Sequence, residues 1–191
     1  RRHGLPEEAM QGLVDARETD LDDVPPRTLD DLIGYAERTS APVIGLSMRI
    51  LGTDPTPHAD FVRDAGIAVA LVGLVRALPF QASTGFVTIP GELCQAAGLD
   101  PTQPHQWPKN PDVSAITLPM LAAAERHVTA ARGSGKRLPR SALPAALPLS
   151  LAARYLARLK RLSGDPKAFN ERPPAASRHF TLMWRSLLGR A

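Results

Sequence analysis

Cysteine is almost absent from the sequence, because Cys94 is the only one among 191 residues. No disulfide can form within the chain, which excludes a disulfide-stapled secreted scaffold. Aromatic residues make up only 5% of the sequence, and no stretch alternates apolar and polar residues over the length of a β-strand. Apolar residues account for 43%. These features predict an all-α fold in which residues 1–191 form a single helical domain.

Long apolar runs are also missing. The most apolar run, Ala65 to Leu78, is shorter than the roughly 20 residues that a membrane-spanning helix needs. We therefore expect no transmembrane span, and we predict a buried central helix that ends at Pro79. Small residues share one face of this helix, where we expect neighbouring helices to approach closely: Gly66, Ala70 and Gly73.

Metal and nucleotide motifs are lacking as well. The five histidines show no HExxH or similar ligand spacing. The Gly-rich run at 133–137 lacks the spacing of a phosphate loop, and no strand precedes it. The acidic residues between 20 and 31 lack the D-x-x-x-D spacing that would put two carboxylates on one helical face, so we assign them to linker solvation and helix capping. We expect no cofactor and no metal.

Helix boundaries are marked by prolines, glycines and caps. Thr28 and Asp31 form a capping-box pattern at the start of one helix, and Ser40-Ala41-Pro42 is interpreted as the start of another. Residues 99–112 contain several prolines and predict an irregular internal loop. The pattern predicts helices over residues 6–20, 28–39, 41–51, 60–78, 90–97, 113–132, 143–162 and 177–188.

Charge is distributed very unevenly. Residues 1–64 contain 7 Lys or Arg against 13 Asp or Glu, whereas residues 126–191 contain 14 against 2, so the two segments carry −6 and +12. The basic half predicts contact with an anionic membrane, RNA or an acidic protein, with a merely solvated surface as the alternative. The candidate interaction surface combines a basic helical stripe with an aromatic residue of the last helix: Arg154, Arg158, Arg161 and Trp184. Solvation of the stripe and core packing of Trp184 are the alternatives.

The segment 60–90 resembles the second diagnostic segment of the squalene and phytoene synthase family. In that family a buried helix, G-x-A-x-Q-L-T-N-I-L-R-D, is followed by G-R-x-Y-L-P. The matching residues here are Gly66, Ala68, Leu71, Arg76, Gly85 and Pro90. The resemblance implies an isoprenoid-synthase-type helical bundle. Residues 1–191 would form its C-terminal two-thirds, without the family's N-terminal helices.

The residues that carry the family's chemistry are replaced. In the enzymes, carboxylates of this segment hold magnesium, which binds the substrate diphosphate, and Mg²⁺ requires hard oxygen ligands. Tyr35 matches a family tyrosine, but Ala41 and Ile44 stand where the enzymes have glycines that let the substrate chain pass. The resemblance therefore implies a degenerate former active site, made of Tyr35, Ala41, Ile44, Ala70, Gly73, Arg76, Ala77, Phe80 and Gln81.

Arg76 lies in the most apolar helix of the chain, where an unpaired charge would be costly to bury. We expect Arg76 to pair with an acidic residue elsewhere in the chain. The alternative is that its side chain points into a residual cavity and meets an anionic group.

The pattern around Arg76-Ala77 resembles a non-catalytic branch of the family, the mitochondrial assembly factors for complex I. The resemblance implies a pseudoenzyme that binds proteins, as an assembly factor or accessory subunit of complex I or another large mitochondrial complex, with complex I intermediates favoured as partners. It implies a location in the mitochondrial matrix, peripheral to the inner membrane. The chain begins with Arg1-Arg2 rather than Met, which we interpret as processing or as a partial sequence.

Two alternatives remain open at this stage. One is an RNA-associated component of mitochondrial ribosome assembly, which rests on the basic half of the chain. The other is a prenyl-diphosphate condensing enzyme whose carboxylates come from a missing segment or from a partner chain.

Overall fold

The computed structural model describes residues 4–22, 24–108 and 111–170, and over these residues the chain is built from helices alone. This confirms the all-α prediction. The α-helices are α1 (Glu7–Glu18), α2 (Leu29–Ile50), α3 (Ala59–Thr84), α4 (Gly91–Ala96), α5 (Ser114–Ser134) and α6 (Leu143–Arg161), joined by short 3-10 turns. The predicted helix at 177–188, which includes Trp184, lies outside the described residues.

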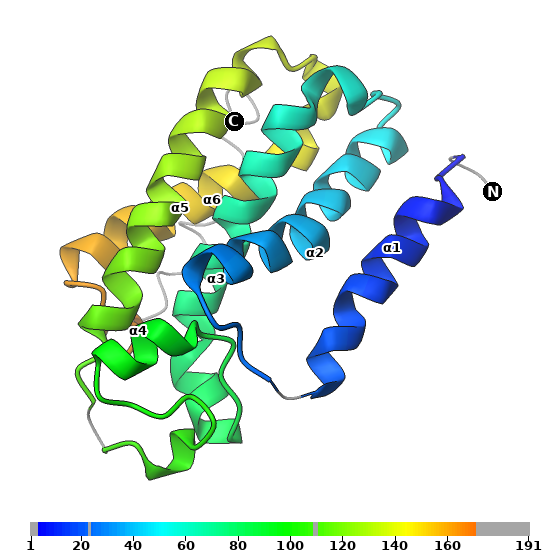
Figure 1. Cartoon of the computed structure of the whole chain (residues 1–191). Coiled ribbons are helices and arrows are strands. Elements are labelled where there is room, and N and C mark those ends of the chain that lie inside the picture. The colour runs from blue at the N-terminus through cyan, green and yellow to red at the C-terminus, as the bar shows by residue number, and fades with distance from the viewer. Residues whose placement is uncertain (1–3, 23, 109–110, 171–191) are drawn as a thin grey trace.

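Helix α3 forms the centre of the bundle, and α2, α5 and α6 pack around it (Figure 1). Leu71 and Val75 on α3 are completely buried, as are Met120 on α5 and Leu159 on α6. A helix that is apolar on nearly all sides buries most surface in this position, because neighbouring helices then cover each side. The prediction of a central core helix is confirmed.

Helix α3 is longer than the sequence pattern predicted. The segment Thr56–Thr84 has a mean hydropathy of 1.7 and is long and apolar enough to cross a membrane, so the argument from length against a span was wrong. In this structure the segment is packed among other helices, with 44% of its most apolar window buried. Length and composition alone do not distinguish a core helix from a membrane span.

Prolines interrupt the helices less than predicted. Pro42 lies inside α2 and Pro79 inside α3, so the expected break at residue 40 and the expected stop at residue 79 were both wrong. An internal proline costs roughly 3 kcal/mol. Burial of Ile44 and Met48 beyond Pro42 offsets this cost in α2. Helix α3 instead ends at Gly85, whose φ of 90° is a left-handed C-cap.

The start of α2 was predicted correctly. The Thr28 hydroxyl accepts a hydrogen bond from the Asp31 backbone N–H at 3.1 Å, and the Asp31 carboxylate accepts one from the Thr28 backbone N–H at 3.0 Å. The hydroxyl and backbone N–H of Thr28 hold the pKa of Asp31 below its usual value. This capping box accounts for one of the acidic residues that had been assigned to helix capping.

Two peripheral parts complete the described chain. Helix α1 lies along α2 and buries none of its side chains completely (Figure 1). The Pro-rich loop contains a short 3-10 turn, Pro104–Gln106, and is held by a 2.7 Å hydrogen bond from Trp107 Nε1 to the Asp100 carbonyl. The loop, the C-terminal turns of α3 and residues 165–167 line a pocket of about 340 Å³, and no residue of the candidate site lines it.

Candidate functional site

The candidate site divides into a buried part on α2 and an open part on α3. Ala41 and Ile44 are 6% and 5% exposed, so both lie in the core. A Cβ atom added to Gly66 would lie 2.4 Å from the Cα of Ala41, which means that the backbones of α2 and α3 touch at this point. The predicted close approach is confirmed at Gly66. Packed side chains and backbone occupy this part of the site.

The outer face of α3 carries the other predicted positions. Ala70, Gly73 and Ala77 share one side of the helix and are half-buried. A Cβ atom at Gly73 would contact nothing within 4 Å, so the close approach predicted there is absent and the prediction was wrong at this residue. Phe80, at the end of the same face, is 71% exposed. This face, Ala70, Gly73, Ala77 and Phe80, is called the α3 outer face below.

The side chains on and beside the α3 outer face do not suit a magnesium ion. Ala70, Gly73, Ala77 and Phe80 have no side-chain oxygen. The amide of Gln81 is engaged with Thr88: its nitrogen lies 3.2 Å from the Thr88 hydroxyl, and its oxygen accepts from the Thr88 backbone N–H at 3.3 Å. Across the described residues, no group of three or more His, Cys, Asp or Glu side chains is placed to hold a metal ion. Mg²⁺ binds hard oxygen ligands, above all carboxylates, which this face does not supply.

Tyr35 connects the site to α1. Its hydroxyl donates a 2.8 Å hydrogen bond to Asp20, and Arg17 contacts both residues, with its guanidinium 3.2 Å from the Asp20 carboxylate and 5.8 Å from the centre of the Tyr35 ring. Burial and the hydrogen bond to Asp20 raise the pKa of Tyr35 to about 12. Sequence reasoning missed this role of Asp20, because hydrogen-bond partners 15 residues apart leave no local pattern.

The side chain of Arg76 differs from its prediction in both burial and pairing. Its side chain is exposed, and no ion pair joins it to an acidic residue within the described chain. Instead its guanidinium lies 4.0 Å from the centre of the Tyr155 ring and 5.3 Å from that of Phe169. The expectation of burial and acid pairing was therefore wrong. The planar guanidinium is weakly hydrated and stacks well on aromatic rings, so it needs no carboxylate here.

One arginine of the basic stripe on α6 packs against the same pair of aromatic rings, Tyr155 and Phe169. Arg158 lies 4.9 Å from the centre of the Phe169 ring, which meets Tyr155 edge to face at 5.3 Å. Arg154 is half-buried, and Arg161 is exposed and donates to the Ala157 carbonyl at 3.3 Å. The three arginines therefore differ in environment and do not form a uniform solvent-facing stripe.

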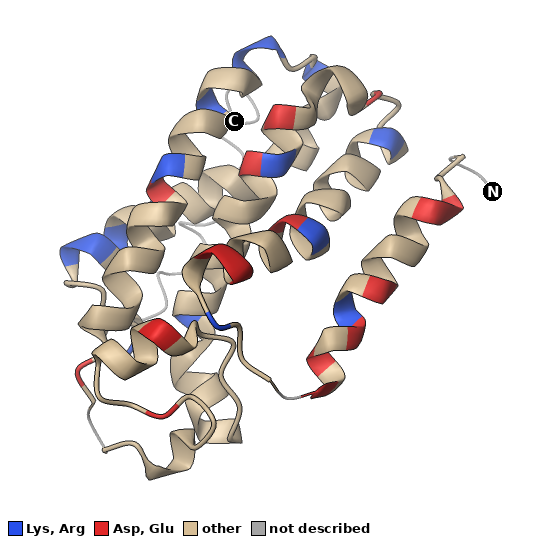
Figure 2. Cartoon of the chain, in the orientation of Figure 1, with Lys and Arg blue, Asp and Glu red and all other residues tan. Residues whose placement is uncertain are grey.

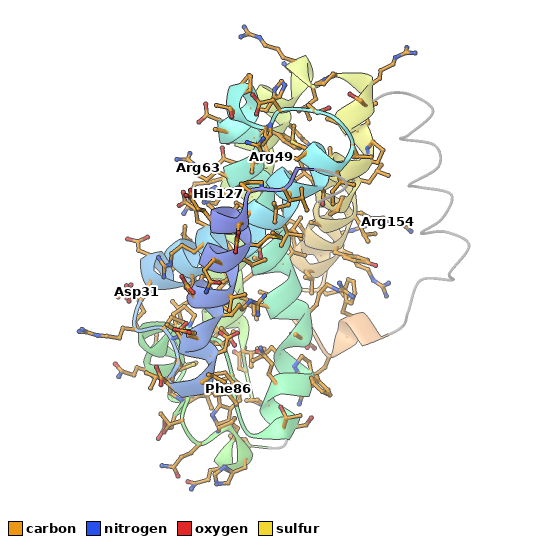
Figure 3. The ribbon with its side chains drawn as sticks, turned by 90° about the vertical axis from the view of Figure 1, so that its right-hand side faces the viewer. Asp31, Arg49, Arg63, Phe86, His127 and Arg154 are labelled. Carbon is orange, nitrogen blue, oxygen red and sulfur yellow. The ribbon has the colours of Figure 1, made fainter. Side chains whose placement is uncertain are left out.

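The sequence did not predict a contact between a buried carboxylate of α3 and a histidine of α5. The Asp64 side chain is 7% exposed and lies 2.9 Å from His127 Nδ1, with Arg63 Nη2 at 3.4 Å. Figure 3 shows Arg63 and His127 on the same side of the bundle. The sequence offers only a weak signal for this pair, an aspartate at the start of an apolar helix, because its partner is 63 residues away.

Cys94 is buried in α4. Burial, with a smaller effect of Asp100, raises the pKa of its thiol to about 12. A thiol that stays protonated is a poor nucleophile, so Cys94 does not supply covalent chemistry to the site.

Comparison with known proteins relates this sequence to squalene and phytoene synthases. The sequence model of squalene/phytoene synthases matches residues 1–179. The chain is 29% identical over 166 residues to human "NADH dehydrogenase (ubiquinone) complex I, assembly factor 6", which covers 86% of this chain and 50% of that protein. It is also 29% identical over 174 residues to a 15-cis-phytoene synthase of a Paracoccus strain, which covers 90% of this chain and 55% of that protein. The chain thus spans about half the length of the curated relatives it matches.

Solved structures show the same fold. Squalene synthase HpnC from Alicyclobacillus acidocaldarius superposes with a TM-score of 0.73 at 18% identity, covering 86% of this chain and 63% of that one. A dehydrosqualene synthase also gives a TM-score of 0.73, at 14% identity, covering 95% of this chain and 65% of that one. The helical bundle and the arrangement of its helices are shared at identities too low to carry function.

Proposed function

This chain belongs to the squalene/phytoene synthase family, and we propose that it is a non-catalytic member that binds proteins during the assembly of mitochondrial complex I. The observation that carries the proposal is the chemistry of the α3 outer face. The helix that resembles the family's metal-binding segment keeps its central position in the fold. Alanine, glycine and phenylalanine occupy positions that a magnesium–diphosphate site would need as polar ligands.

Similarity to the complex I assembly factor supports the choice of partner. That relative and the phytoene synthase match equally well by identity, so identity alone does not decide between binding and catalysis. The replaced ligands, the engaged amide of Gln81 and the closed crossing at Ala41 and Gly66 favour binding. The proposed location is the mitochondrial matrix, peripheral to the inner membrane.

We place the partner contact on the α3 outer face. Phe80 is 71% exposed beside three small, half-buried residues, which together form a shallow apolar surface. Exposed apolar surface of this kind is typical of protein interfaces, and aromatic residues dominate their energetics. Because Phe80 is largely exposed, its substitution removes little core packing. A Phe80 variant therefore tests partner binding without unfolding the protein.

The proposal is tested by tagging the chain in mitochondria and resolving its complexes on a native gel, with mass spectrometry of the bands. Co-migration with complex I subunits or intermediates is the expected result, and Phe80→Ser should weaken it. Val43→Ser is the matched control, because Val43 is 48% exposed on α2, away from the α3 outer face. Co-purification with ribosomal proteins and RNA, or migration as a lone small species, would overturn the assembly role.

The enzymatic alternative is tested separately with purified protein. We expect no magnesium-dependent consumption of a prenyl diphosphate, because the described residues provide no carboxylate ligands on the α3 outer face. Turnover that requires magnesium and disappears with chelator would show that the chain is an enzyme.

A further inference from the structure

The connection between α5 and α6 concentrates positive charge at one end of the bundle (Figure 2). Arg132, Lys136, Arg137 and Arg140 lie within nine residues of sequence, and all of them are exposed. Within the described chain none of these side chains makes a hydrogen bond or an ion pair. This group, Arg132, Lys136, Arg137 and Arg140, is called the basic tip.

Exposed aliphatic side chains lie at the same end of the bundle. A 2.9 Å hydrogen bond between Thr53 and Ser141 joins the α2–α3 loop to the α5–α6 connection, and Figure 1 shows both connections at one end. Ile50 and Leu51, just before Thr53, are 46% and 37% exposed. The basic tip is therefore accompanied by apolar surface that no described helix covers.

The α5–α6 connection is held firmly against the core. A Cβ atom added to Gly135 would lie 3.0 Å from the Phe61 ring, so the backbone here packs directly on that buried side chain. The cations are consequently presented from a fixed position rather than from a long unpacked loop.

Acidic residues at this end do not neutralise the basic tip. Asp54 is paired with Arg49 at 3.7 Å and accepts two hydrogen bonds from Thr56. Asp64 is buried and paired with His127. Asp60, on the first turn of α3, remains exposed. The four unpaired cations of the tip outweigh it.

We infer that the basic tip, together with Ile50 and Leu51, docks this protein on an anionic phospholipid surface. Lysine and arginine are attracted to the negative headgroups, and short aliphatic side chains enter the boundary between headgroups and acyl chains. Single-stranded RNA is a poorer fit, since RNA-binding surfaces stack bases on exposed aromatic residues and none is described here.

The basic tip suits a membrane surface better than the α6 stripe does. Arg158 of that stripe is stacked on Phe169, whereas no hydrogen bond, ion pair or ring contact joins a cation of the tip to another described side chain. Docking on phospholipid goes beyond the proposed role in assembly. Vesicles of pure lipid test this docking in the absence of any complex I protein. Failure of vesicle binding would count against the peripheral membrane location and would leave the proposed role in complex I assembly untouched.

The experiment is flotation of the purified full chain with vesicles of phosphatidylcholine alone or with an added anionic phospholipid. We expect binding only to the anionic vesicles and a loss of binding as salt rises. Each cation removed should weaken partitioning by about fivefold, so the variant Lys136→Gln, Arg137→Gln, Arg140→Gln should lose roughly 100-fold. Leu51→Ser should weaken the binding that persists at high salt.

The matched control removes the same charge elsewhere. Arg38→Gln, Arg126→Gln, Arg161→Gln changes three exposed arginines outside the tip, two within α2 and α5 and one at the C-terminal end of α6. This control should lose much less than the tip variant, and circular dichroism should show both folded. Equal losses in the two triple variants, no binding of the wild type to anionic vesicles, or preferential binding of RNA through the tip would overturn the inference.

Discussion

Gly66 and Ala41 are in backbone contact, so that a methyl group at residue 66 would lie 2.4 Å from the Cα of Ala41. This contact sets the distance between α2 and α3, and it is possible only because residue 66 has no side chain. Because the neighbouring atoms belong to the backbone of Ala41, a larger residue at 66 requires one of the two helices to move.

Gly66→Ala should therefore lower the free energy of unfolding by about 1–3 kcal/mol, the usual cost of overpacking a core. Gly73→Ala is the matched control on the same helix, because a Cβ there meets nothing within 4 Å. It should raise stability by up to about 1 kcal/mol through helix propensity. Urea unfolding of both variants checks this, and equal effects would show that the α2–α3 contact is looser than described.

Tyr35 should titrate at high pH. The chain has two tyrosines, so in a Tyr155→Phe background the remaining phenol is Tyr35, and its ultraviolet absorbance should change at a pH of about 12. In urea the midpoint should return to about 10. Since folding raises the pKa of Tyr35, the contribution of its protonated hydroxyl to the free energy of unfolding is fully present below pH 10. This contribution is lost as pH rises toward 12. Asp20→Asn in the same background should move the folded midpoint partly back, and a midpoint near 10 in folded Tyr155→Phe protein would contradict the contact.

Arg76 and Tyr155 should be energetically coupled. A double-mutant cycle with Arg76→Gln and Tyr155→Leu should give a coupling of about 0.5–1 kcal/mol, as expected for an exposed cation–π contact. Pairing Arg76→Gln with Leu151→Ala, on the same helix as Tyr155, is the control and should give additive changes. A coupling near zero would mean that Arg76 has a different partner in solution.

His127 should matter more for stability than Arg63, although both contact Asp64. His127→Ala should lower the free energy of unfolding by about 2–3 kcal/mol, because it leaves a buried carboxylate without its shortest partner. Arg63→Gln should cost less than about 1 kcal/mol, since the Arg63 side chain is 52% exposed. Chemical denaturation of the two variants decides this, and the reverse order would assign the buried carboxylate to Arg63.

Cys94 should resist thiol reagents in the folded protein. Its side chain is buried, and its pKa is raised to about 12, so the thiolate is scarce at neutral pH. A chromogenic disulfide reagent should react at less than one thiol per chain over minutes in buffer and with one thiol per chain in urea. Rapid labelling of the native protein would show that α4 opens readily.

The sequence by itself determined the helical class and much of the chemistry of the site. Apolar periodicity placed the central helix, and the Thr28–Asp31 pattern located the start of α2, because both depend on residues a few positions apart. The absence of side-chain oxygens at Ala70, Gly73 and Ala77 can likewise be read from the sequence, since a missing oxygen is missing in any fold.

The tertiary structure alone decided which residues meet across the bundle. Pro42 stays inside α2 because buried residues on either side of it, Ala41 and Ile44, offset the local cost of proline, and Pro79 stays inside α3 directly after the buried Leu78. Arg76 stacks on Tyr155, and Asp64 pairs with His127, across separations of 79 and 63 residues. Such contacts depend on how whole helices are arranged against one another, and local sequence patterns do not record that arrangement.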